Sequence, residues 1–230
     1  FFVVVAKSGS TLMHRLVEDL CEITETGIIN ISDTCFLAGI PERKIPEVIL
    51  PALPDKQPAF YYGFRCIGNL KKSHVFRTSP KIYLVRDPRD SATSLFFSMQ
   101  KSHQMPKEGL TEKIIREQRE MAGRMDINEF IQGGAADFIF TALEEIRQQI
   151  WLPETNLFRY EDIIFKKSLW IATMCRIAGI SVSDDDMAEL LKTHDIVPSA
   201  ENPAEHIRQV APGNFRNHLS DDTIRYIEAK

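Results

Sequence analysis

The sequence predicts an α/β fold, a single domain with a central parallel β-sheet flanked by helices. Residues 2–5 and 81–85 form two short apolar runs rich in β-branched side chains, which is typical of buried strands. Each run ends in a polar turn that is followed by residues with helical spacing. Strands that alternate with helices favour a parallel sheet covered on both faces. The length of 230 residues suits one domain over residues 1–230, and the sequence leaves open whether either end is truncated.

The first half of the chain shows these elements in order. After the first strand, apolar residues at helical spacing predict a helix over residues 10–24. The proline-rich residues 40–58 are predicted to form a surface loop, and the aromatic run over residues 60–64 predicts a short strand.

The second half is predicted to be mostly helical. Asp87 suits the N-cap and Pro88 the first position of a helix that continues over residues 90–101. Residues 105–125 have helical spacing, and residues 126–151 predict two helices broken at a pair of glycines. The remaining predicted elements are a strand over residues 156–160 and helices over residues 167–178 and 184–194.

The turn after the first strand has the composition of an anion site. It reads Lys7, Ser8, Gly9, Ser10 and Thr11, so a glycine turn leads directly into a helix start. Backbone N–H groups at such a helix start hold phosphates, and the lysine and hydroxyl groups add donors. The lysine precedes the glycine, so the turn is not a Walker loop, and the GxGxxG pattern is absent. We therefore expect a nucleotide phosphate to bind here.

A second candidate anion site follows the second apolar run. Arg86 comes directly after that strand, and Ser94 lies about two helical turns later. Because open α/β sheets bind ligands at the carboxyl ends of their strands, Lys7 and Arg86 are expected to face one crevice. The neighbouring Arg89 and Asp90 are interpreted as a solvated salt-bridge cluster.

A third basic segment lies near the carboxy-terminal end, over residues 206–218. Its Pro212, Gly213 and Asn214 are turn-forming residues, and basic side chains surround them. We expect a cationic flap here, followed by a last helix.

Together, these segments resemble the sulfotransferases that use 3′-phosphoadenosine 5′-phosphosulfate (PAPS), which have a fold like that of P-loop nucleotide kinases. In that family, a loop close to Pro-Lys-Ser-Gly-Thr-Thr-Trp binds the 5′-phosphosulfate. The lysine-containing turn matches it, with Ala6 in place of the proline and Leu12 in place of the tryptophan that stacks on adenine. An Arg at a strand end and a Ser eight residues later bind the family's 3′-phosphate, and Arg86 and Ser94 match these positions.

The family's late motif, Arg-Lys-Gly-x-x-Gly-Asp-Trp-Lys, is matched loosely. Arg208, Gly213 and Arg216 fit it, whereas Gln209 and Val210 depart from it, so the affinity for the cofactor stays open. A Tyr-Glu-Asp sequence after a strand is also typical of the family and occurs here. The resemblance implies cofactor contacts at Lys7, Ser8, Gly9, Ser10, Thr11, Leu12, Arg86, Ser94, Tyr160, Arg208, Gln209 and Val210.

The resemblance also implies sulfuryl transfer by in-line displacement. The family commonly has Lys-Thr-His or Lys-Ser-His before the second strand, and Lys72 and His74 match this motif. We expect His74 to be the general base, because the ordinary pKa of histidine, about 6.5, lies near the working pH. Lys72 is expected to hold the sulfuryl oxygens and Lys7 to neutralise the leaving phosphate, so no metal is expected. The alternative for His74 is an ordinary loop histidine.

Composition restricts the partners and the compartment. A net charge of −4 argues against broad nucleic-acid binding, so an anion site must be local. Four dispersed cysteines without a CxxC pattern favour free thiols in a reducing, cytoplasmic compartment, although their even number leaves a secretory disulfide open. No apolar run approaches the ~20 residues of a membrane helix, and no signal peptide is visible. The sequence leaves open whether an N-terminal leader or anchor has been removed.

Two alternative functions follow from the same residues. A nucleotide or small-molecule kinase would need magnesium carboxylates and a Walker lysine, neither of which is evident. A non-catalytic nucleotide-binding module fits the departures in the motifs, although the retained Lys72 and His74 argue against it. The sequence does not identify the acceptor, which could be a small molecule, a lipid-like alcohol or a carbohydrate. The acidic composition favours a small or lipid-like alcohol. Whether oxygen or nitrogen is sulfated, and the oligomeric state, cannot be predicted.

Overall fold

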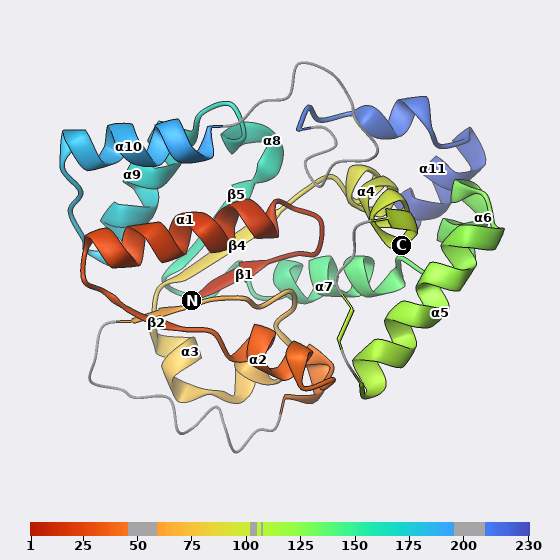
Figure 1. Cartoon of the computed structure of the whole chain (residues 1–230), viewed down its shortest axis with the longest axis horizontal. Helices are drawn as coiled ribbons and strands as arrows, with labels where there is room; N and C mark the ends of the chain where they lie inside the picture. The colour runs from red at the N-terminus through yellow and green to blue at the C-terminus, as the bar shows by residue number, and fades with distance from the viewer. Residues whose placement is uncertain (46–58, 102–104, 107, 196–209) are drawn as a thin grey trace.

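Three parallel strands form the centre of the computed structural model, which describes residues 1–45, 59–101, 105–106, 108–195 and 210–230 (Figure 1). The strands β1 (Phe2–Val4), β4 (Lys81–Val85) and β5 (Thr155–Arg159) lie in the order β1-β4-β5.

Two further parallel strands, β2 (Gly27–Ile29) and β3 (Ala59–Tyr61), extend this arrangement beside β1. A parallel bridge joins Val3 to Phe64, and the Val4 N–H donates to the Phe64 carbonyl at 2.8 Å. The predicted parallel sheet is therefore confirmed within the described residues, together with the α/β fold class.

Helices surround the strands on both faces (Figure 1). They are α1 (Ser10–Ile23), α2 (Ile31–Leu37), α3 (His74–Thr78), α4 (Pro88–Lys101), α5 (Leu110–Arg124), α6 (Ile127–Gln132), α7 (Asp137–Arg147), α8 (Tyr160–Ile163), α9 (Lys167–Ala178), α10 (Asp184–His194) and α11 (Asp221–Glu228). Short 3₁₀ helices cover Glu42–Lys44, Gly68–Lys72 and Asn214–Asn217. None of these helices is long and apolar enough to cross a membrane.

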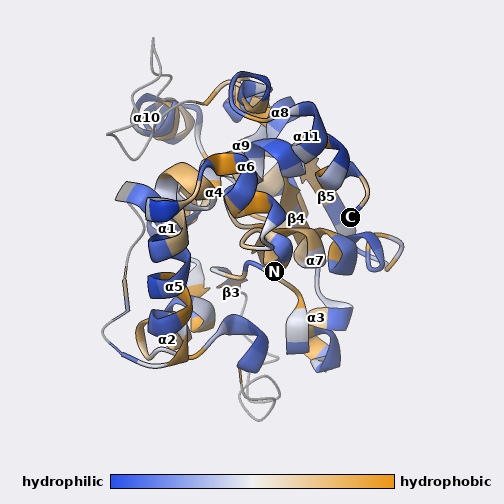
Figure 2. Cartoon of the chain, turned by 90° about the vertical axis from the view of Figure 1, so that its right-hand side faces the viewer, coloured by the Kyte–Doolittle hydropathy of each residue, from blue (hydrophilic) through white to orange (hydrophobic). Residues whose placement is uncertain are grey.

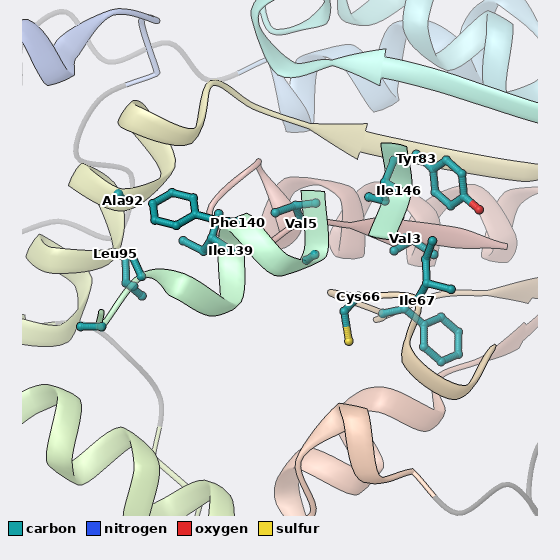
Figure 3. Packing of buried hydrophobic residues seen from close by; sticks show 14 of the residues in the cluster. Val3, Val5, Cys66, Ile67, Tyr83, Ala92, Leu95, Ile139, Phe140 and Ile146 are labelled. Atoms are coloured by element: carbon teal, nitrogen blue, oxygen red, sulfur yellow. The ribbon is translucent and has the colours of Figure 1, made fainter. Parts of the chain in front are cut away.

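Side chains along each strand point alternately to the two faces of the sheet, so the core consists of two clusters, one on each face. Phe2 and Val4 pack with residues of α1, α9 and α10, whereas Val3 and Tyr83 pack with residues of α4, α6 and α7. Figure 3 shows Val3 and Tyr83 beside Ile146 of α7. In Figure 2 the outward sides of α1 and α5 are mostly blue, while orange residues gather around β4. Successive strand residues point to opposite faces, so one short strand supports both clusters.

Several boundaries match the sequence prediction. Helices α9 and α10 have the predicted bounds, and Gly179 ends α9 with a φ of +69°. Helix α4 begins at Pro88 as predicted, and Asp87 Oδ1 accepts the Arg89 N–H at 2.9 Å. The break in the predicted helix pair near Gly133 separates α6 from α7.

Short elements without a clear period were missed. The sequence pattern did not indicate β2, α2, α3 or α8, each of which has seven residues or fewer. The strand predicted over residues 60–64 was too long: β3 ends at Tyr61, and Gly63 has a φ of +93°. Most of the predicted loop over residues 40–58 lies outside the described residues.

Candidate functional site

The turn between β1 and α1 has an unusual backbone. Lys7 has a φ of +67°, in the left-handed region that residues other than glycine rarely adopt. Gly9 has a φ of +90°, and a Cβ there would lie 3.2 Å from a ring carbon of Tyr160. Backbone strain of this kind persists where the surrounding structure enforces it and is common at ligand sites. The helix that follows has no acidic residue in its first turn, so its positive N-terminal dipole is not neutralised there.

Arg86 joins this loop from the neighbouring strand. Its side chain is 8% exposed, and Nη1 donates to the Lys7 carbonyl at 3.2 Å. The guanidinium lies over the Tyr160 ring, 4.5 Å from the ring centroid, in a cation–π contact. The predicted crevice at the carboxyl ends of β1 and β4 therefore brings Lys7 and Arg86 together.

Two buried polar atoms at this edge have no hydrogen-bond partner within the described part of the chain. They are Ser8 Oγ and Arg86 Nε. Leaving buried polar groups unsatisfied costs about 1–3 kcal/mol each, so native structures generally provide partners for them. A phosphate or sulfate oxygen accepts from both a hydroxyl and a guanidinium, so these residues fit an anionic ligand.

A small pocket adjoins the loop on the side of α1 and α9. Its lining combines loop, strand and helix residues: Ser8, Gly9, Leu12, Leu84, Tyr160, Ile163, Ile164, Lys167 and Trp170. Trp170 is 2% exposed, and its indole Nε1 has no hydrogen-bond partner within the described residues. The space between these side chains does not admit a water molecule, so they pack against the loop and hold it beside α9. The sequence did not single out Trp170, which lies inside an ordinary amphipathic helix.

The predicted Tyr-Glu-Asp sequence begins α8 and contacts two other segments. The Tyr160 hydroxyl donates to the Val210 carbonyl at 3.0 Å. Glu161 Oε1 accepts the Asp87 N–H at 2.8 Å, immediately before α4. These side chains therefore join the ends of β4 and β5 to the carboxy-terminal segment.

The neighbouring Arg89 and Asp90 differ from one another. Arg89 pairs with Asp87 at 2.7 Å and Glu228 at 2.8 Å, in agreement with the predicted salt-bridge cluster. The prediction was wrong for Asp90, whose side chain is 1% exposed and accepts the backbone N–H groups of Gly213 and Phe215. A carboxylate removed from water needs such donors, and sequence neighbours alone gave no sign of them.

The structure does not bring Lys72 and His74 to this site. Both are exposed, and His74 begins α3, which leads into the amino end of β4. The Phe1 amino group donates to the Pro80 carbonyl at 2.8 Å, so the chain after α3 lies beside the start of β1. Lys7 lies beyond the other end of β1, and strands rise about 3.3 Å per residue. The five residues of β4 thus separate the two edges by about 16 Å.

The other predicted site residues are distributed as follows. Ser10, Thr11 and Leu12 form the first turn of α1, and Ser94 is half-buried in α4. Val210 is buried. Arg208 and Gln209 lie outside the described residues.

The remaining histidines and possible metal ligands contribute other contacts. His14 lies between Glu18 at 3.0 Å and Asp33 at 3.2 Å, and the Asp33 hydrogen bond raises its pKa. His194 is buried against Asp19 at 2.7 Å. Within the described ranges, no group of three or more His, Cys, Asp or Glu side chains is placed to hold a metal ion.

Comparisons with known proteins cover nearly the whole chain. The family model described as "Sulfotransferase domain" matches residues 1–227. A mouse sulfotransferase, SULT7A1, complexed with PAP has a similar structure, with a TM-score of 0.62 and 16% identity over 100% of this chain and 80% of that chain.

Two structures of retinol dehydratase are also similar. The complex with androsterone and the inactive cofactor PAP has a TM-score of 0.58 and 18% identity, covering 99% of this chain and 78% of that chain. The complex with retinol and PAP has a TM-score of 0.59 and 16% identity, with the same coverage. At these identities, the similarity establishes the fold alone. A search of curated protein sequences found no significant match.

Proposed function

The chain belongs to the sulfotransferase domain family, and on this basis we propose that it is an enzyme that transfers a sulfuryl group from PAPS to a hydroxyl or amine acceptor. The observation that carries the proposal is the meeting of Lys7, Ser8 and Arg86 at the carboxyl ends of β1 and β4. There, Ser8 Oγ and Arg86 Nε are buried without partners among the described residues.

The residues present fit the nucleotide in two places. The turn from Lys7 to Thr11 would hold the 5′-phosphosulfate through backbone N–H groups and hydroxyls, as a helix start does for other phosphates. Arg86 and Ser94 would hold the 3′-phosphate, Arg86 through its buried Nε, which has no hydrogen-bond partner among the described residues. The solved relatives are complexed with PAP, which supports a nucleotide of this type as the ligand.

PAPS supplies the sulfuryl group and a phosphate leaving group. The chain's contribution is position and charge: the Lys7 ammonium neutralises negative charge at the leaving phosphate, and Arg86 fixes the loop through the Lys7 carbonyl.

The predicted roles of Lys72 and His74 are not part of this proposal. Both lie at the opposite edge of the sheet, so neither residue is positioned to act on a group bound at Lys7.

We further propose a small or lipid-like alcohol as the acceptor. Solved relatives hold androsterone or retinol, which are small apolar molecules with a hydroxyl group. A reducing, cytoplasmic location accompanies this proposal, because Cys21, Cys35, Cys66 and Cys175 are free and buried.

The test is thermal stabilisation by adenosine 3′,5′-bisphosphate (PAP), compared with ADP and with ATP–magnesium. A ligand at 100 times its dissociation constant adds about 2.7 kcal/mol of apparent stability. We expect PAP to stabilise the protein selectively. Arg86→Gln should lose this response, whereas Arg159→Gln, an exposed arginine at the end of β5, should retain it. A response to ATP–magnesium alone would overturn the proposal in favour of a kinase.

Turnover separates an enzyme from a binding module. With PAPS and a panel of small alcohols, we expect sulfated product that depends on both substrates. Selective PAP binding without any product from the acceptor panel would favour a non-catalytic nucleotide-binding module.

A further inference from the structure

We propose that Asp90 and Tyr160 attach the carboxy-terminal segment, residues 210–217, to the nucleotide site at two points, and that Asp90 thereby positions Arg86 for the 3′-phosphate. Asp90 is a positioning residue in this proposal, because an ionised carboxylate has no hydrogen to donate to a phosphate. The inference rests on the proposed function.

The first attachment is made by the Asp90 carboxylate. Its Oδ2 accepts the Gly213 N–H at 2.6 Å, and its Oδ1 accepts the Phe215 N–H at 3.0 Å. The two oxygens therefore bind different residues of the segment. Hydrogen bonds to an ionised group are about twice as strong as neutral ones, and a buried carboxylate is costly without them. Asp90 thus holds the segment over α4 with a single side chain.

The turn in the segment is shaped for this contact. Gly213 has a φ of +87°, and a Cβ there would lie 2.6 Å from Arg216 Nη1. A residue with a side chain at this position would be strained and would have to displace Arg216. The glycine therefore allows a turn that directs both N–H groups to one carboxylate.

The second attachment is made by Tyr160 and lies at the start of the segment. Its hydroxyl donates to the Val210 carbonyl at 3.0 Å, while its ring lies against Arg86. Phe215, near the other end, contacts two guanidinium groups: those of Arg89 and Arg216 lie 4.3 Å and 4.7 Å from its ring centroid. The segment is thus fixed on both sides of its glycine turn.

Arg86 connects both attachments to the nucleotide site. Its Nη2 lies 4.0 Å from Asp90 Oδ2, and its Nη1 donates to the Lys7 carbonyl. The guanidinium also lies over the ring of Tyr160. Nε is the atom of this guanidinium that has no partner among the described residues. The hydrogen bond to the Lys7 carbonyl and the nearby Asp90 charge therefore favour one orientation of the guanidinium, which leaves Nε for a phosphate oxygen.

The test compares two ligands that differ in the 3′-phosphate. Dissociation constants for PAP and for adenosine 5′-phosphate are measured by calorimetry on wild type, Asp90→Asn and Tyr160→Phe. We expect Asp90→Asn to weaken PAP binding by about tenfold or more, because it removes charge-assisted hydrogen bonds, while adenosine 5′-phosphate binding changes by less than about threefold. Tyr160→Phe loses only the hydroxyl that donates to the Val210 carbonyl. It should also lower the preference for PAP over adenosine 5′-phosphate.

Thr93→Val is the matched control, since Thr93 is buried on the same helix and bonds to the Arg89 carbonyl. It should leave the preference for PAP unchanged. Equal weakening of both ligands in Asp90→Asn would indicate a general structural role and overturn the inference. If Asp90→Asn does not fold, an unchanged preference in Tyr160→Phe would overturn it.

The wild-type protein separates this inference from the proposed function. A wild type that does not prefer PAP to adenosine 5′-phosphate would overturn both. A wild-type preference that survives in both variants would overturn the two-point attachment alone.

Discussion

At the scale of single residues, Gly9 combines a φ of +90° with close packing against the Tyr160 ring. Gly9→Ala should therefore lower the free energy of unfolding by about 1–2 kcal/mol, because a side chain is strained in this region and must displace Tyr160. Urea unfolding measures this effect. PAP should also stabilise the variant less than wild type, because the loop that we propose to hold the phosphosulfate must shift.

The matched control is Gly123→Ala inside α5, where a Cβ would meet no atom within 4 Å. Alanine favours helices over glycine, so this variant should gain about 0.5 kcal/mol. A stability loss at Gly123 similar to that at Gly9 would contradict the explanation for Gly9.

His74 tests the catalytic interpretation at the same scale. Because it begins α3 at the amino edge of the sheet, we expect His74→Asn to retain turnover within about threefold of wild type. Lys7→Met should lose turnover by about two orders of magnitude or more, as expected for an electrostatic contact with the leaving group. A loss in His74→Asn of the 10²–10⁴-fold typical of a missing general base would restore His74 to the mechanism.

These residues show what the sequence predicts at this scale. Lys7 and Arg86 follow directly after strands, so the sheet alone brings them together, and this was predictable. The position of His74 depends on α3, which is only five residues long and has no period to reveal it. Asp90 was misjudged because its partners, Gly213 and Phe215, lie more than 120 residues away in sequence.

At the scale of elements, His14 links α1 to the segment that begins with α2. Asp33 raises the pKa of His14 chiefly through a hydrogen bond, and Glu18 adds to the effect. Burial opposes it, and Arg65 does so to a smaller extent. The Tyr62 ring packs against the imidazole, with centroids 4.8 Å apart. A raised folded pKa means that the folded state binds the proton more tightly, so this stabilisation is fully present below the ordinary pKa of about 6.5.

The stabilisation from His14 is therefore lost as pH rises through its raised pKa in the folded state. We expect wild type to be more stable than His14→Gln at pH 6, with the difference shrinking toward pH 9, as measured by urea unfolding. Asp33→Asn should show less of the same pH dependence, because the main partner is gone. A wild-type advantage that grows with pH would contradict this assignment.

Local signals explain which elements the sequence predicted. Helix α10 has a Ser183 N-cap that accepts the Asp186 N–H at 3.1 Å, followed by three aspartates, so its start was legible. Strand β2 has exposed or half-buried residues throughout and therefore lacks the apolar pattern of a strand. Its place depends on pairing with β3, a long-range contact that a sequence window does not contain.

At the scale of the whole molecule, the sheet brings residues that are far apart in the sequence together at one site. The loop after β1, Arg86 after β4 and Tyr160 after β5 all follow carboxyl ends, and the segment that contains Gly213 closes over them through Asp90. The ordered motifs allowed the first three to be predicted together. The attachment of the last segment required the packed structure, because both bonded N–H groups belong to the backbone and carry no sequence signal.

The two core clusters should unfold together, because one strand supports both. Val3 belongs to the cluster with α4 and α7, and the adjacent Val4 to the cluster with α1 and α9. The protein has two tryptophans: Trp151 is 84% exposed, and Trp170 is buried in the second cluster. Trp151→Phe should therefore leave fluorescence that reports the second cluster alone.

In urea, we expect Trp170 fluorescence of this variant and far-UV circular dichroism to give coincident transitions, the behaviour of a single cooperative domain over residues 1–230. Saturating PAP should move both midpoints by the same amount, because the proposed site at the carboxyl edge of the sheet contacts residues of both clusters, Tyr160 and Phe215 among them. Transitions that separate, or a PAP shift seen by fluorescence alone, would instead divide the chain into two units. The nucleotide would then stabilise only the α1 and α9 side, and the attachment at Asp90 would not couple the carboxy-terminal segment to the rest of the site.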